Sequence, residues 1–273
     1  MIAAFPFLVI VSLILGTAGC QTLKDHQDSS AKEQNRTDLS IARAFLEAGS
    51  PDKAMFELRS VLETEPSNAQ AHGLMGLAQL ALMNPRKAVQ HLEMAWKLEP
   101  RSEAALNLSS AYIESKRYDS AQKIIASGLS LKETPPYRNK ERFYHNLGLL
   151  AERKGSLIAA EKAYRKALEE NPTFYLSRAR LASLLDEKHK TDEAKTHWEI
   201  ARNSCPGCFD ATNQLVKYYL VKGDLRTALG LVQDYKKIEG LNPMEAKKAN
   251  ELERDLMSAR SKTASDRPQN QPR

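Results

Sequence analysis

The chain has 273 residues, which is enough for one or two compact domains or for one extended array of repeats. Only 7% of the residues are aromatic, and the abundance of Ala, Leu, Lys and Glu favours helices over β-sandwiches and barrels. The net charge is +6, and the basic residues are scattered along the chain, which argues against a protein that binds nucleic acid.

The first predicted element is a signal peptide at residues 1–19. The first twenty positions contain no Asp, Glu, Lys or Arg, and the apolar run from Phe5 to Leu15 is too short for a comfortable membrane span. Small residues then lead directly into Cys20, which resembles the lipobox of bacterial lipoproteins, where the cysteine is acylated. This resemblance implies a lipid anchor and, because Gln21 follows the cysteine, the periplasmic face of the outer membrane. An ordinary secretory signal with a chance cysteine is the alternative.

After a polar, flexible tether at residues 20–34, the sequence repeats itself at steps of 34 residues. The alanines that mark the register are Ala54, Ala88, Ala160, Ala194 and Ala228. Four residues after each of them, and after Ala121, stands a large side chain: Leu58, Leu92, Ile125, Tyr164, Trp198 and Val232. Small residues let two antiparallel helices approach closely, and large residues fill the space between helix pairs. An unrelated helical bundle would not keep such a register.

This pattern resembles the tetratricopeptide repeat, a pair of antiparallel helices, and the resemblance implies an all-α, right-handed superhelical solenoid of about six repeats. Repeats 1–3 are assigned to residues 35–135, and a short insertion with repeats 4–6 to residues 136–242. The individual repeats are predicted at 35–68, 69–101, 102–135, 141–174, 175–208 and 209–242. An amphipathic helix at residues 243–260 is expected to cap the last repeat, and residues 261–273 to form a disordered tail. The turns between paired helices are expected at Gly49, Gly155 and Gly223.

The sequence carries no enzyme signature, and no cofactor or metal ion is predicted. It lacks a Gly-rich phosphate loop, a Gly-x-Ser-x-Gly elbow and a His-Glu-x-x-His motif. The six histidines share no spacing typical of metal ligands. Cys205 and Cys208 flank a Pro-Gly turn before the last repeat, and in an oxidising compartment they are expected to form a structural disulfide. Free thiols and a redox-active pair are the alternatives.

In tetratricopeptide arrays the first helices of the repeats line a concave groove, and the resemblance implies a partner-binding surface at their inward-facing positions. The predicted groove residues are Leu74, Leu77, Asn107, Arg142, His145, Asn146, Leu149 and Arg180. Asn side chains in a groove can bond the backbone of an extended peptide regardless of its sequence. The clamp with which chaperone-binding members hold a C-terminal carboxylate is not expected, because Leu106, Ser110 and Leu176 occupy three of its positions.

A lipid-anchored array of six repeats resembles the pilotin family of type IV pilus biogenesis lipoproteins. The more specific marks are an Asn before the small residue in both central repeats, in Leu106-Asn107-Leu108-Ser109 and His145-Asn146-Leu147-Gly148. The Pro-x-Cys-Phe sequence at Cys208, followed by Asp210-Ala211, looks like the myxobacterial gliding-motility branch.

This resemblance implies a non-catalytic scaffold that binds outer-membrane secretin subunits and promotes their assembly or localisation. Two alternatives stay open. One is another adaptor of the cell envelope, which would serve outer-membrane protein assembly, peptidoglycan hydrolases or polysaccharide export. The second is a periplasmic thiol protein that uses Cys205 and Cys208.

Overall fold

The computed structural model describes residues 30 and 32–265, without the side chains of residues 259 and 262–265. The chain divides into two compact units, Met1–Leu131 and Lys132–Arg273. Throughout the described residues the secondary structure consists of helices joined by turns and bends, with no strand. The predicted all-helical repeat fold is therefore confirmed. The signal peptide and Cys20 lie outside the described residues.

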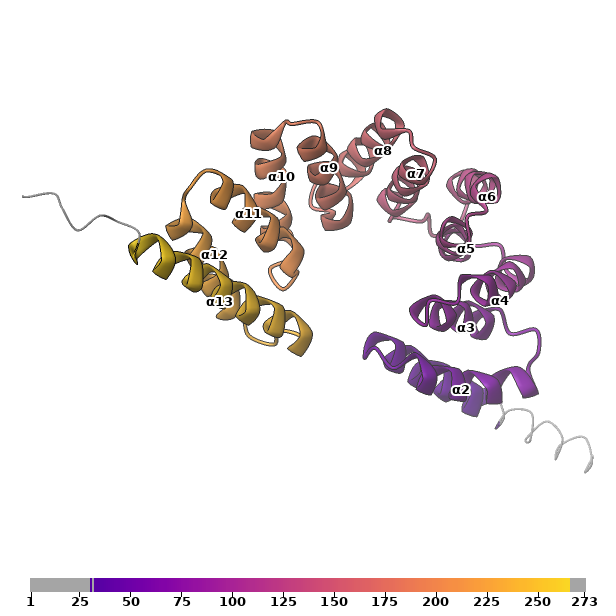
Figure 1. The fold of residues 1–273 in the computed structure, drawn as a ribbon. Coiled ribbons are helices and arrows are strands. Elements are labelled where there is room, and N and C mark those ends of the chain that lie inside the picture. The colour runs from indigo at the N-terminus through magenta and orange to yellow at the C-terminus, as the bar shows by residue number, and fades with distance from the viewer. Residues whose placement is uncertain (1–29, 31, 266–273) are drawn as a thin grey trace, which may run out of the picture. The chain divides into compact units, whose positions relative to one another are not determined.

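The first unit is a stack of helix pairs that follow one another along the chain (Figure 1). A helix at residues 32–47 precedes the labelled helices. These are α2 (Pro51–Thr64), α3 (Ala69–Ala81), α4 (Pro85–Leu98), α5 (Ser102–Glu114) and α6 (Tyr118–Ser130). Each labelled helix packs against the next, and α3 also contacts α5. The first helices of two successive repeats therefore lie side by side.

The second unit repeats this arrangement and adds a long final helix. Its helices are α7 (Glu141–Arg153), α8 (Leu157–Glu170), α9 (Tyr175–Glu187), α10 (Thr191–Ser204), α11 (Phe209–Val221), α12 (Leu225–Lys236) and α13 (Pro243–Ser265). Consecutive helices are packed together, α7 touches α9, and α13 packs against both α11 and α12 (Figure 1). The last helix thus covers the end of the stack.

The repeated small and large residues are the packing core of both units. All six alanines of the register are buried, and so are the six large side chains that follow them. At Gly76 an added Cβ atom would overlap the Leu92 side chain, and at Gly148 it would overlap the Tyr164 ring. The 34-residue pattern therefore reflects close contact between the two helices of a repeat.

The turn between the paired helices has the same backbone conformation in all six repeats. Gly49, Gly155 and Gly223, where turns were expected, have positive φ. The three residues at the equivalent turns of the other repeats also have positive φ, between 58° and 62°: Met83, Lys116 and His189. From the sequence, only the turns with glycine could be predicted, because residues other than glycine seldom have positive φ.

Two boundaries differ from the sequence-based prediction. Residues 32–34, assigned to the tether, are already helical, and α13 continues to Ser265, beyond the predicted end of the capping helix at residue 260. Residues 261–265 are therefore helix and not disordered tail. Between α6 and α7 the inserted residues form an irregular connection, and they lengthen neither helix.

Candidate partner-binding site

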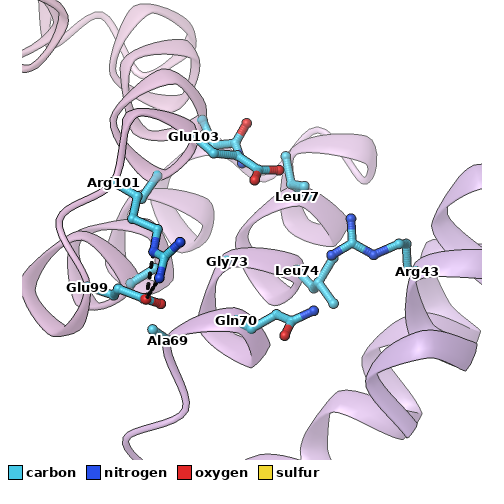
Figure 2. Close-up of a pocket in the computed structure, with 12 residues that line it drawn as sticks. Arg43, Ala69, Gln70, Gly73, Leu74, Leu77, Glu99, Arg101 and Glu103 are labelled. Carbon is cyan, nitrogen blue, oxygen red and sulfur yellow. Dashed lines mark hydrogen bonds and ion pairs between the residues drawn. The ribbon is translucent and has the colours of Figure 1, made fainter. Parts of the chain in front are cut away.

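The first unit contains a groove on its first helices, which we call the N-terminal groove (Figure 2). Its walls come from the helix at residues 32–47, from α3, from the end of α4, and from α5 with the segment that leads into it. Its volume is about 490 Å³. The lining residues are Arg43, Ala69, Gln70, Gly73, Leu74, Leu77, Ala95, Glu99, Arg101, Glu103, Ala104 and Asn107.

The N-terminal groove combines an apolar floor with polar groups of both signs. Leu74, which is buried, and Leu77, which is half-buried, both line the groove. Figure 2 shows Arg43 reaching in from one side and Glu103 lying on the other. The side-chain amide of Asn107, which is half-buried, both donates and accepts hydrogen bonds. An extended peptide could therefore place apolar side chains on the floor and bond its backbone at the rim.

In the second unit, His145 is an interior group. Its Nδ1 lies 3.0 Å from the Ser177 hydroxyl, and its ring packs 5.6 Å from the rings of both Tyr164 and Phe174. Burial, together with the positive charges of Arg180 and Arg142, lowers the pKa of His145 from 6.5 to about 4. The imidazole is therefore neutral at neutral pH and belongs to the packing of α7 against α9.

The two arginines next to His145 form a cationic surface on the second unit. Arg142 is exposed, and Arg180, also exposed, lies 3.5 Å from the Glu152 carboxylate. Both act electrostatically on His145, so both guanidinium groups lie near the same part of α7. Asn146 is buried, and Leu149 is partly buried against the core of this unit. The exposed arginines are the groups that can reach a partner.

The predicted groove residues thus fall into two sets. Leu74, Leu77 and Asn107 line the N-terminal groove in the first unit, while the other five lie on α7 and α9 in the second unit. A single continuous groove stays a prediction. Sequence reasoning missed Gln70 and Glu103, although each stands one helical turn before a predicted groove residue, a spacing that places them on the same helix face. Arg43 was missed because its helix was assigned no groove positions.

Cys205 and Cys208 are joined by a disulfide in the structure, with their Cα atoms 5.4 Å apart. Cys205 ends α10 and Cys208 precedes α11, so the bond closes the turn between repeats five and six. The Tyr235 hydroxyl donates a hydrogen bond of 2.6 Å to the Gly207 carbonyl in the same turn. The turn is therefore also held from α12, independently of the sulfur atoms.

The described part of the chain contains neither a metal-binding cluster of His, Cys, Asp and Glu side chains nor a membrane-spanning helix. Its His, Cys, Asp and Glu side chains form no group of three or more that could hold a metal ion. Its helices are also too short or too polar to span a membrane.

The family model of the tetratricopeptide repeat matches residues 102–135 and 141–174, the ranges assigned to the third and fourth repeats. The chain contains tetratricopeptide repeats. The chain is 25% identical over 203 residues to the type IV pilus assembly protein PilF of Pseudomonas aeruginosa, and the alignment covers 72% of this chain and 78% of PilF.

Solved structures of pilus proteins share the same fold. The structure of Pseudomonas aeruginosa PilF matches with a TM-score of 0.60 and 20% identity, covering 81% of this chain and 99% of PilF. The type IV pilus biogenesis factor PilW matches with a TM-score of 0.61 and 15% identity, covering 78% and 97%. Together with the repeat matches and the sequence similarity to PilF, this shared fold confirms the predicted relationship to tetratricopeptide-repeat proteins of type IV pilus biogenesis.

Proposed function

We propose that the protein is a non-catalytic adaptor of type IV pilus biogenesis that holds an extended segment of an outer-membrane secretin subunit. By holding this segment, the adaptor promotes the assembly or localisation of the secretin. The observation that carries the proposal is the N-terminal groove, which presents apolar and amide groups together. The sequence similarity to the pilus assembly protein PilF supports the choice of cellular system.

The chemistry of the groove suits an extended segment better than a folded domain. Alternate side chains of an extended peptide point to one side, where Leu74 and Leu77 form an apolar floor. Its backbone groups then lie within reach of amides such as those of Gln70 and Asn107. In the second unit, Arg142 and Arg180 are proposed to bind carbonyl or carboxylate oxygens of the same partner.

The proposed location is the periplasmic face of the outer membrane, with a lipid on Cys20 as the anchor. Two or three acyl chains, at about 0.8 kcal/mol for each buried methylene group, make such an anchor effectively permanent. A protein held there is close to the membrane in which secretins assemble.

The proposal is tested by a groove variant of the full chain that carries Arg43→Ala, Gln70→Ala and Asn107→Ala. Each change removes a polar contact worth about 1 kcal/mol, so binding of the secretin segment should weaken on the order of 100-fold. In cells, heat-stable secretin multimers should be lost, as measured by immunoblotting. Circular dichroism should show unchanged helix content, because none of the three side chains is buried.

The matched control carries Arg86→Ala, Gln90→Ala and Gln122→Ala, three exposed positions on the second helices α4 and α6. It should assemble multimers as the unmodified protein does. Normal assembly by the groove variant, or equal failure of both variants, would overturn the N-terminal groove as the docking surface.

A further inference from the structure

A second pocket of the first unit lies among α2, α3 and α4. It is lined by Met55, Arg59, Leu62, Glu63, Met75, Gln79 and His91, and we call it the Met–His pocket. Its volume is about 340 Å³, and it shares no residue with the N-terminal groove. The role proposed for that groove therefore makes no use of it.

Gln79, which lines this pocket, carries a side-chain oxygen without a hydrogen-bond partner among the described residues. Gln79 is 7% exposed, and its Nε2 donates a hydrogen bond of 3.3 Å to the sulfur of Met55. Its Oε1 is fully buried and has no hydrogen-bond partner among the described residues. A buried amide oxygen without a partner is costly to the fold, and such a group points to a ligand that occupies the pocket.

The hydrogen bonds around His91 assign the protons of its ring. His72 Nε2 lies 3.0 Å from the Pro66 carbonyl oxygen, and because that oxygen can only accept, His72 Nε2 carries the proton. A His72 ring that carries this single proton has an acceptor at Nδ1, and His91 Nδ1, 3.1 Å away, donates to it. The remaining nitrogen of His91, Nε2, therefore keeps a free lone pair.

Beside the charged side chains of Arg59 and Glu63, the pocket gathers four electron-pair donors, of which the Met55 sulfur already accepts a hydrogen bond from Gln79 Nε2. The four donors are the thioether sulfurs of Met55 and Met75, the Nε2 of His91 and the Oε1 of Gln79. Thioethers with an imidazole select soft cations such as Cu(I) over hard ones. A histidine that binds a metal usually donates its other N–H to a fixed acceptor, which here is His72.

We propose that the Met–His pocket binds one soft monovalent cation of the Cu(I) and Ag(I) class. Met55, Met75 and His91 are the proposed ligands, with the Gln79 oxygen facing the positive charge. His72 acts as a positioning residue, because it fixes the tautomer of His91. This site is independent of the adaptor function proposed above.

The probe for the test is Ag(I), which requires no reductant. The full chain is used with Cys20→Ser, Cys205→Ser and Cys208→Ser, so that no thiol competes for the ion. Calorimetric titration should show saturable binding of a single equivalent. In the methyl NMR spectrum, the resonances of Met55 and Met75 should shift, while those of the exposed Met83 and Met94 should stay in place.

The ligands are tested with Met55→Leu/Met75→Leu and, separately, with His91→Phe. Each variant should bind Ag(I) at least about tenfold more weakly, because losing even a supporting residue of a metal site typically costs that much. The matched control, Met83→Leu/Met94→Leu, should bind as the parent does. Absence of saturable binding, unchanged Met55 and Met75 resonances, or equal affinity of the Met55/Met75 variant and the control would each overturn the proposal.

Discussion

Gly148 lets the ring of Tyr164 lie directly against the backbone of α7. A methyl group at this position would overlap the ring, and because the ring is fully buried it cannot move aside freely. Gly230, in the middle of α12, is also a helical glycine, but an added Cβ atom would meet nothing within 4 Å. Replacing each of these glycines by alanine therefore distinguishes the cost of steric overlap, at Gly148, from the ordinary preference of alanine for helices, at Gly230.

We expect Gly148→Ala to lower the free energy of unfolding by about 1–3 kcal/mol, because overpacking forces side chains and backbone to shift. Gly230→Ala should raise it by about 0.4–1 kcal/mol, because alanine restricts the unfolded chain and favours the helix. Urea unfolding followed by circular dichroism measures both. A stabilising Gly148→Ala would show that α7 and α8 are less tightly packed than the structure indicates.

The buried imidazole of His145 gives the fold a pH dependence of known sign. Burial, with Arg180 and Arg142 nearby, lowers its pKa from 6.5 to about 4, so the unfolded chain binds the proton more readily than the folded one. The neutral His145 therefore contributes to the free energy of unfolding fully above pH 6.5, and this contribution is lost as the pH falls towards 4. The loss should reach about 3 kcal/mol, at 1.36 kcal/mol for each pKa unit.

The contribution of His145 is isolated by comparing unfolding free energies of the unmodified protein and His145→Gln between pH 7.5 and pH 4.5. The variant should show a shallower dependence, while His189→Gln, at an exposed turn, should follow the unmodified protein. Identical slopes for the unmodified protein and His145→Gln would mean that folding leaves the pKa of His145 unchanged.

At the scale of helices, α13 supplies the apolar surface that the last repeat would otherwise expose. Ala249 and Leu256 of α13 join the core cluster that contains Phe209, Val232 and Tyr235 of the preceding two helices. A terminal repeat has no neighbour on its outer side, so a stack of this kind requires such a cover.

Leu256→Ala should destabilise the protein by about 2–5 kcal/mol, because the side chain is 3% exposed and its removal leaves a cavity. The adjacent Met257 is 44% exposed, and Met257→Ala should change stability by less than about 0.5 kcal/mol. Thermal and urea unfolding of both variants provide the comparison. Equal, small effects would show that α13 does not cap the stack.

The disulfide between α10 and α11 is expected to be structural. Replacing Cys205 and Cys208 by Ser should cost at most roughly 2 kcal/mol, since the closed loop is short and the Tyr235 hydroxyl also holds the turn. The melting temperature should therefore fall slightly, while pilus-dependent function is retained. Loss of function at unchanged stability would favour the redox-active alternative.

The helices were predictable because their register is repeated, whereas some of their ends and the three turns without glycine were not. The alanine and large-residue positions fix how the paired helices meet, and all of them are buried as expected. The positive φ at Met83, Lys116 and His189 could not be predicted from the sequence. Hydrogen bonds at the helix ends impose this conformation on residues that do not favour it. The extension of α13 beyond residue 260 lacked an apolar pattern that could have indicated it.

For the whole molecule, sequence periodicity predicts which helix faces line a groove but not which side chains stay accessible. Asn146 and His145 occupy predicted inward positions, yet both are buried, and His145 packs against the rings of Tyr164 and Phe174. The Met–His pocket could not be predicted, since Met55, Met75 and His91 come from three helices and share no spacing. Packing of the first two repeats brings them together.

The proposed location of the whole molecule depends on Cys20, which lies outside the described residues. Labelling with an alkyne-tagged fatty acid should mark the unmodified protein and Cys205→Ser, but not Cys20→Ser, because the small residues before Cys20 form the predicted acylation site. Without its acyl chains, Cys20→Ser should move from the membrane to the soluble periplasmic fraction. Purified Cys20→Ser should still bind a secretin segment, because the N-terminal groove is unchanged, while heat-stable multimers in cells should decrease. Labelling of Cys20→Ser, or no labelling of the unmodified protein, would exclude this cysteine as the anchor.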